Sequence, residues 1–189
     1  KEASTVKLED CKLKNNTSDI TNGEPAGGPA LYVRNGTAYC YKTEITGNRA
    51  NNRGGAIRLW GGAGDSQLIL ESCLIADNTS TGDWGGAIQT SSISGTGCKT
   101  YILNSIIVNN HVKQGAAVNS AEVMVIAYST IANNTADNNS TGLQLRCESD
   151  RFVIINSIIT GNRTSNASTA PDIMLQRDNR VITSKGYNL

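Results

Sequence analysis

The sequence is poor in the residues from which helical and metal-binding proteins are usually built. Its 189 residues include one Phe, one His and three Pro. Good helix formers are scarce, whereas Asn, Gly, Ser and Thr, which favour turns, are abundant. The five cysteines show no Cys-x-x-Cys spacing, so no zinc-type motif is present. The composition therefore predicts an all-β protein without a metal site or a cofactor.

Long hydrophobic runs and a strong charge of either sign are also missing. The longest apolar runs, such as VMVIA at 123–127, are far too short to span a bilayer. Lys and Arg number 17 against 16 Asp and Glu, which leaves a net charge of +1, and no basic run occurs. These features predict no transmembrane segment in this chain, and they argue against nucleic acid or an anionic membrane as the partner.

The chain does contain a repeated pattern, in which a small residue is followed by x-aliphatic-x-x-Asn. The first copy is CKLKNN at 11–16 and the sixth is SIITGN at 157–162, and a seventh starts as KGYNL at 185–189. The closing asparagines recur every 24–32 residues, at Asn16, Asn48, Asn78, Asn110, Asn134 and Asn162. A second word, GGAI, occurs at 54–57 and again at 85–88.

Alignment on the first pattern produces columns of one residue type. Three residues before the small residue stand Leu8, Cys40, Leu70, Ile102, Ile126, Ile154 and Ile182. Two residues after it stand Leu13, Ile45, Ile75, Ile107, Ile131, Ile159 and Tyr187. Alternation within each copy predicts short strands, and a fixed period of this length is typical of a solenoid.

Parallel crossover connections are overwhelmingly right-handed. The sequence therefore predicts a right-handed parallel β-helix of about seven coils. We expect a single domain over residues 1–189, as a fragment of a longer exported protein.

The recurrent asparagine has a structural explanation. Each copy ends a strand, where the chain must turn, and Asn tolerates left-handed backbone angles better than other non-glycine residues. Stacked Asn side chains can also bond amide to amide along the axis of a solenoid. We interpret the six asparagines as a structural ladder and not as a binding site. Gly54-Gly55 and Gly85-Gly86 are expected to admit the chain into the next strand.

The cysteines are predicted to remain free thiols even in an exported protein, where disulfides could form. Cys11 and Cys73 share a column but lie two coils apart, roughly 9–10 Å by strand spacing, which is beyond disulfide reach. Cys40 stands in an aliphatic column and should behave as a small buried hydrophobe. Cys98 and Cys147 fall in separate coils near variable loops.

The two words together resemble a known repeat pair. In the passenger regions of chlamydial polymorphic outer-membrane proteins, Gly-Gly-Ala followed by Ile, Leu or Val alternates with Phe-x-x-Asn. Here Ile or Leu replaces that Phe, and degraded copies of GGAI are QGAAV (114–118), STGLQ (140–144) and APDIM (170–174). The tail, 170–189, also resembles the ending of secreted pectin-lyase-like β-helix proteins of Bacteroidetes. The resemblance implies a β-helix at a cell surface.

The pectin-lyase-like fold also hosts polysaccharide lyases and hydrolases, whose chemistry needs converging carboxylates. Outward from the GGAI strand, the first aligned row is Tyr32, Arg58, Gln89, Asn119, Gln144 and Met174. The next row is Arg34, Trp60, Ser91, Ala121, Arg146 and Gln176, and neither row holds a carboxylate. The aspartates of the loops are interpreted as solvated turn residues: Asp65, Asp83, Asp137, Asp150 and Asp172.

The lone histidine, His111, has no second His and no Ser or Cys placed as a partner. The sequence therefore predicts no catalytic residue.

A binding surface is the positive alternative. The residues expected on one flank of the rod are Tyr32, Arg34, Arg58, Trp60, Trp84 and Gln89. Aromatic faces beside hydrogen-bonding side chains suit sugar rings, although both Trp side chains could instead pack under loops.

We expect a non-catalytic extracellular or bacterial cell-surface protein, either an adhesin passenger or a glycan-binding stalk. Its partner would be a polysaccharide or a host cell-surface glycoprotein. The alternatives are a polysaccharide lyase or glycoside hydrolase with its site in the loops, and a structural spike such as a phage tail fibre.

Overall fold

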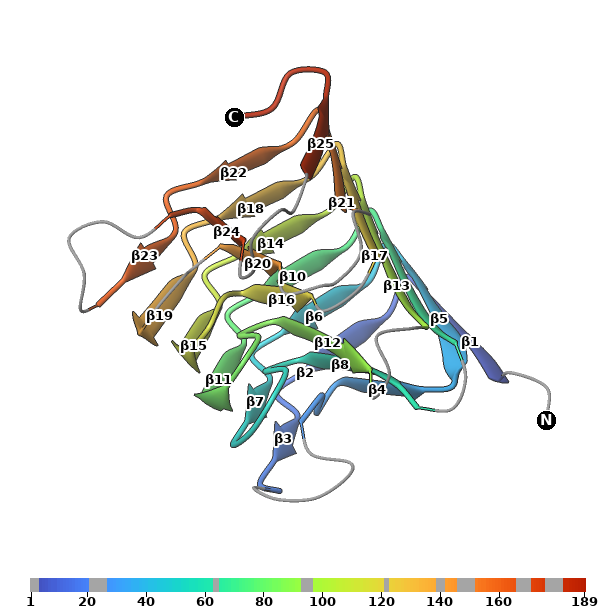
Figure 1. Cartoon of the computed structure of the whole chain (residues 1–189). Helices are drawn as coiled ribbons and strands as arrows, with labels where there is room; N and C mark the ends of the chain where they lie inside the picture. Colours follow the sequence, from blue (N-terminus) through green and yellow to red (C-terminus); the bar gives the residue numbers. More distant parts are fainter. Residues whose placement is uncertain are drawn as a thin grey trace.

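The computed structural model describes residues 4–20, 27–62, 65–92, 97–120, 123–138, 142–145, 152–165, 171–175 and 182–189. Over these ranges the chain forms 25 strands, and it contains no helix that could cross a membrane. The strands build four parallel sheets, here named A to D, which stack along one axis from the blue N-terminal end to the red C-terminal end (Figure 1).

Sheets A and B form the first half of each coil. Sheet A contains β1 (Ser4–Glu9), β5 (Gly36–Tyr41), β9 (Ser66–Glu71), β13 (Cys98–Leu103), β17 (Val123–Ala127), β21 (Phe152–Ile155) and β25 (Ile182–Lys185). Sheet B contains β2 (Lys12–Lys14), β6 (Glu44–Thr46), β10 (Leu74–Ala76), β14 (Ile106–Val108), β18 (Thr130–Ala132) and β22 (Ile158–Thr160).

Sheets C and D complete the coil. Sheet C contains β3 (Thr17–Ser18), β7 (Arg49–Ala50), β11 (Thr79–Asp83), β15 (His111–Gln114), β19 (Thr135–Asn138) and β23 (Arg163–Thr164). Sheet D contains β4 (Leu31–Arg34), β8 (Ile57–Gly61), β12 (Ile88–Ser92), β16 (Val118–Ser120), β20 (Leu143–Leu145) and β24 (Ile173–Leu175). The predicted parallel β-helix is thus confirmed. It has six four-stranded coils and the first strand of another, slightly fewer than the seven coils expected.

The register places the predicted aliphatic columns inside the rod. Ile75 pairs with Ile45 and Ile107, and Ile126 pairs with Ile102 and Ile154. The side chains of these columns are buried from coil 2 to coil 6 and form one continuous core. Removal of this apolar surface from water is the main stabilising contribution to the fold.

The seventh copy of the repeat departs from the prediction. Ile182 pairs with Phe152 and not with Ile154, whose partner is Ser184. Asn188, not the predicted Lys185, stands at the position of the small residue, because its Oδ1 accepts a hydrogen bond from the backbone N of Ser157 at 2.9 Å. Lys185 pairs with Ile155, so this coil has two residues before Asn188 where the preceding coil has one before Ser157. Alignment on the short word KGYNL therefore placed the strand column two residues too early and the small residue three residues too early. Tyr187, predicted to lie in an inner column, is 95% exposed.

The six repeat asparagines form a continuous ladder at the turn between sheets B and C. Each one in coils 1 to 5 donates from its backbone N and its Nδ2 to the Oδ1 of the next, at 2.8–3.0 Å. From Asn48 onward each Nδ2 also donates to a carbonyl of the preceding coil. One asparagine therefore links three successive coils.

The left-handed backbone angle lies one residue earlier than predicted. The positive-φ residues of this turn are Asn15, Gly47, Asp77, Asn109, Asn133 and Gly161, whereas the ladder asparagines are not among the positive-φ residues. The ladder side chains must point inward to bond one another, so the preceding, outward residue makes the turn. The first GGAI word needs its two glycines for different reasons. Gly54 adopts a left-handed backbone angle, with φ 63°. At Gly55 there is no room for a side chain, because a Cβ would lie 2.0 Å from the carbonyl oxygen of Gly86.

Candidate functional site

Five of the six predicted binding residues, all except Trp84, lie in sheet D. Arg58 pairs with Tyr32 on one side and Gln89 on the other, while Trp60 pairs with Arg34. The row continues from Gln89 through Asn119 and Gln144 to Met174, as the alignment predicted. In the second row, Ala121, Arg146 and Gln176 lie outside the described residues.

Arg58 and Gln89 do not form an exposed surface, contrary to the prediction. Their exposed fractions are 1% and 3%, although both side chains point away from the core of the coil. The guanidinium carbon of Arg58 lies 5.9 Å from the ring centroid of Tyr32 and 5.1 Å from that of Trp60. Cation–π attraction at these distances holds the two rings beside the buried cation. Arg58 is therefore a positioning residue for two half-buried rings.

The surface of this cluster is formed by three side chains. Tyr32 and Trp60 are half-buried and Arg34 is exposed. The carbonyl oxygen of Trp60 accepts a hydrogen bond from the hydroxyl of Ser66 at 2.8 Å, which fixes the end of β8. Trp84 is half-buried and follows β11 at a φ of 64°, at the turn that enters the next sheet D strand.

The buried row beside this cluster contains two hydrogen-bond acceptors without a donor in the described residues. Asn119 donates from its Nδ2 to Gln144 Oε1 at 2.5 Å, and Gln144 donates to the sulfur of Met174 at 3.6 Å. Gln89 Oε1 and Asn119 Oδ1 are buried, and neither accepts a hydrogen bond within the described part of the chain. An unsatisfied buried acceptor is costly, so each would gain from a hydroxyl or water donor.

His111 has two polar partners that the sequence analysis did not predict. Its Nδ1 lies 3.0 Å from the hydroxyl of Thr135 in the next coil, and its Nε2 lies 3.6 Å from the Asp137 carboxylate. The His111 and Asp137 side chains are 38% and 44% exposed. Thr135 is exposed, and the His111 and Asp137 side chains are partly exposed on the outer surface of sheet C. We interpret them as a polar connection between coils.

The aspartates likewise have structural contacts. Asp172 was predicted to be a solvated turn residue, but its Oδ1 accepts hydrogen bonds from the backbone N and Nδ2 of Asn162, at 2.9 and 2.7 Å. It therefore ends the asparagine ladder by supplying the acceptor that a further asparagine would provide. Asp65 pairs with Lys99 at 3.2 Å. Asp150 and the side chain of Asp83 lie outside the described part of the structure.

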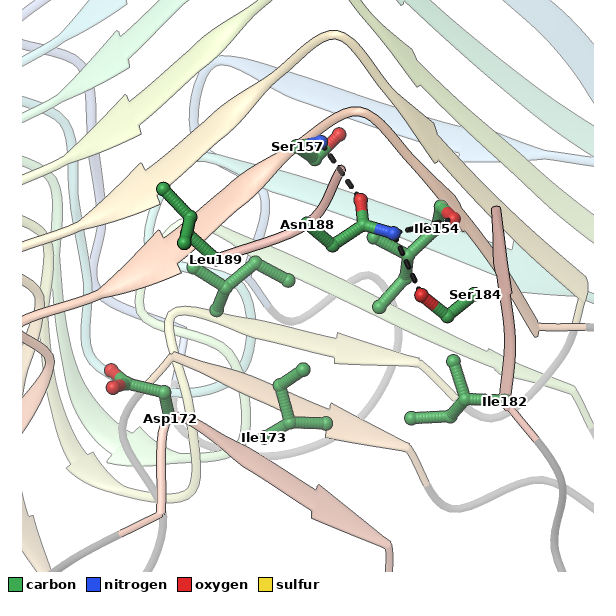
Figure 2. Close-up of a pocket in the computed structure, with 9 residues that line it drawn as sticks. Ile154, Ser157, Asp172, Ile173, Ile182, Ser184, Asn188 and Leu189 are labelled. Carbon is green, nitrogen blue, oxygen red and sulfur yellow. Dashed lines mark hydrogen bonds between the residues drawn. The ribbon is translucent and has the colours of Figure 1, made fainter. Parts of the chain in front are cut away.

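A hollow of about 200 Å³ opens at the C-terminal end of the rod (Figure 2). Its apolar walls are the inner side chains of the last coils, including Ile154, Ile159, Ile173 and Ile182. Asp172 and Asn188 stand at its edge, each capping a hydrogen-bonded column. The hollow is therefore the interior of the solenoid seen at its end, and it presents no converging catalytic groups.

No protein-family model, curated protein or solved structure matches this chain. The strand register alone establishes the parallel β-helix, and this fold is compatible with many activities. The described residues also contain no group of three or more His, Cys, Asp or Glu side chains that could hold a metal ion.

Four cysteines, Cys11, Cys40, Cys73 and Cys98, are free thiols, while Cys147 lies outside the described residues. Burial raises the pKa of Cys40 to about 12, with a smaller contribution from neighbouring Cys73, and burial also raises the pKa of Cys73. Only the thiolate is nucleophilic, so both should stay protonated and unreactive at neutral pH.

We expect a thiol reagent to titrate five groups in denatured protein, while in the native protein Cys11 reacts well before Cys40 and Cys73. Replacement of Cys40 by Ala should remove one of the slow groups and leave the fast one unchanged. A denatured count of three or fewer would show a disulfide. Equal native rates for Cys11 and Cys40 would contradict the burial of Cys40.

Proposed function

We propose that this β-helix is a non-catalytic glycan-binding stalk of the pectin-lyase-like type, displayed at a bacterial cell surface or secreted. The observation that carries the proposal is the aromatic pair of sheet D, in which Tyr32 and Trp60 flank the Arg58 guanidinium beside exposed Arg34. The resemblance of the GGAI and aliphatic-x-x-Asn words to surface-protein repeats supports the location.

The chemistry of the cluster suits a sugar better than other ligands. Each sugar ring has an apolar face that stacks on an aromatic side chain and hydroxyl groups that need hydrogen-bond partners. Trp60 and Tyr32 offer the faces, while Arg34 offers several N–H donors on the exposed side. Since Tyr32 and Trp60 lie in neighbouring coils, an extended chain could follow the rod axis across rungs about 4.8 Å apart.

Binding to a panel of neutral and acidic polysaccharides tests the proposal. We expect Trp60→Ala and Arg34→Ala each to weaken binding by at least about 1 kcal/mol, roughly fivefold, because hot-spot contacts concentrate in aromatic and Arg side chains. Tyr187→Ala and Arg49→Ala are matched controls, since both side chains are exposed and lie away from the cluster. Neither control should change the affinity.

Three results would refute the proposal. The first is that no glycan in the panel binds wild-type protein. The second is that Trp60→Ala lowers the melting temperature without affecting any ligand. The third is release of sugar fragments during incubation, which would instead support the lyase or hydrolase alternative. A mass-spectrometric check of each polysaccharide after incubation distinguishes this third result from simple binding.

A further inference from the structure

Six asparagines share a left-handed backbone conformation at turns of the rod. Their φ angles lie between 44° and 57°, at Asn15, Asn35, Asn104, Asn109, Asn133 and Asn156. Five of them are exposed and Asn156 is half-buried. Asn35 differs from the other five in the residue that follows it, because Gly36 comes next, whereas Ser or Asn follows the others.

The hydrogen bonds of the backbone N–H groups also set the Asn35 turn apart. After each of the other five asparagines, the next backbone N donates to a side-chain oxygen of the following coil, at 2.9–3.1 Å. At Asn35 the bond lies one residue earlier, since Ser66 Oγ accepts from the backbone N of Asn35 itself, at 2.8 Å. The backbone N of Gly36 is therefore not the donor to this side-chain column.

The side-chain amide of Asn35 is positioned by the neighbouring coil. Its Oδ1 accepts a hydrogen bond from the backbone N of Gly62 at 3.1 Å. A backbone N–H aimed at a carbonyl oxygen stabilises the negative charge that develops there during nucleophilic attack. The Cγ atom of Asn35 is thus activated as an electrophile, while the residue as a whole remains exposed to water.

We propose that Asn35 deamidates spontaneously in the folded protein, because its turn leaves the Gly36 nitrogen outside the hydrogen-bonded column. Hydroxide removes the proton of the Gly36 N–H, and the nitrogen attacks Asn35 Cγ to close a five-membered succinimide. The amide nitrogen of the side chain takes a proton from water and leaves as ammonia. Water then opens the ring at either carbonyl, which gives aspartate or isoaspartate at position 35. Glycine favours ring closure because it has no Cβ to obstruct the approach.

The attack requires local opening at the N-terminal edge of sheet A. Gly36 is buried and pairs with Ser4 of β1, whose carbonyl oxygen would lie 2.6 Å from a Cβ on Gly36. β1 is the edge strand of this sheet, and all of its residues except Leu8 are exposed. Segments with few buried contacts open most readily, without global unfolding. Fluctuations of coil 1 therefore give the Gly36 nitrogen access to the Asn35 side chain.

Deamidation alters the charge beside the aromatic cluster of sheet D. A neutral amide becomes a carboxylate, so the formal net charge falls by one unit, from +1 to 0. Asn35 Oδ1 and Arg34 Nε converge on Gly62, because they lie 3.1 and 3.6 Å from an ideal Cβ there. The new carboxylate is therefore placed to pair with Arg34. The reaction itself does not depend on glycan binding.

Incubation of the native protein at mildly alkaline pH, followed by peptide mapping with mass spectrometry, tests the proposal. We expect Asn35 to convert at least about tenfold faster than Asn109, a difference of about 1.4 kcal/mol in activation free energy. The rate should rise with pH, since the attacking nitrogen must lose its proton. The map must separate the other Asn-Gly pair, Asn22-Gly23, which lies outside the described residues. Asn35→Gly, which adopts the turn without strain, should abolish the acidic species that forms at this site.

Ser105→Gly is the matched control, because it creates a second Asn-Gly pair at a left-handed turn. There the backbone N of residue 105 donates to Ser129 Oγ at 3.1 Å, so Asn104 should remain slow. Equal conversion of Asn104 in this variant and of Asn35 would overturn the proposal. So would an intact Asn35 in native protein after a time in which the urea-denatured chain has converted, because the fold would then protect the site.

Discussion

Replacing Asn110 with Ala should lower the free energy of unfolding by about 3–5 kcal/mol, because a single side chain satisfies several buried groups. Asn110 is fully buried in the middle of the ladder. Its Oδ1 accepts from the backbone N and the Nδ2 of Asn78, and its Nδ2 donates to the Ile75 carbonyl and to Asn134 Oδ1, at 2.9–3.0 Å. An alanine would leave the Asn78 amide and the Ile75 carbonyl without these partners.

Urea denaturation followed by circular dichroism measures this effect. The control is Asn109→Gly, one residue earlier, where an exposed asparagine at φ 56° contributes only the turn. Glycine adopts this angle without strain, so the control should cost less than about 1 kcal/mol. If Asn109→Gly proves as costly as Asn110→Ala, the turn and not the hydrogen-bonded ladder stabilises this corner.

The solenoid could be predicted from the sequence because its core repeats. Each inner column needs one aliphatic residue per coil, so Ile75, Ile107 and Ile131 recur at the same position of the pattern and are paired in the structure. The ladder could also be predicted, because every coil must supply one asparagine side chain to continue it. Such local, repeated requirements are what a single sequence displays most clearly.

Predictions about the outer surface were less successful, because exposure depends on what covers a strand and not on its alternation. Arg58 and Gln89 point out of the coil as predicted, yet both are buried.

Positions that break the period could not be predicted either. Asp172 caps the ladder from the same coil as Asn162, ten residues later, instead of from a further repeat. The partners of His111 also come from a neighbouring coil, and the pairing of β15 with β19 brings them beside it. Both contacts depend on side-chain geometry across coils, which spacing along the chain does not specify.

Replacement of Ile126 with Ala should cost about 2–5 kcal/mol through loss of buried surface and formation of a cavity. Ile126 is 1% exposed and lies between Ile102 and Ile154 in the inner column of sheet A. Val123→Ala, in the same strand but on the outer surface, should cost less than about 1 kcal/mol. Urea denaturation of both variants tests the assigned alternation. Equal losses for the two variants would mean that β17 does not present alternate residues to the core and to solvent.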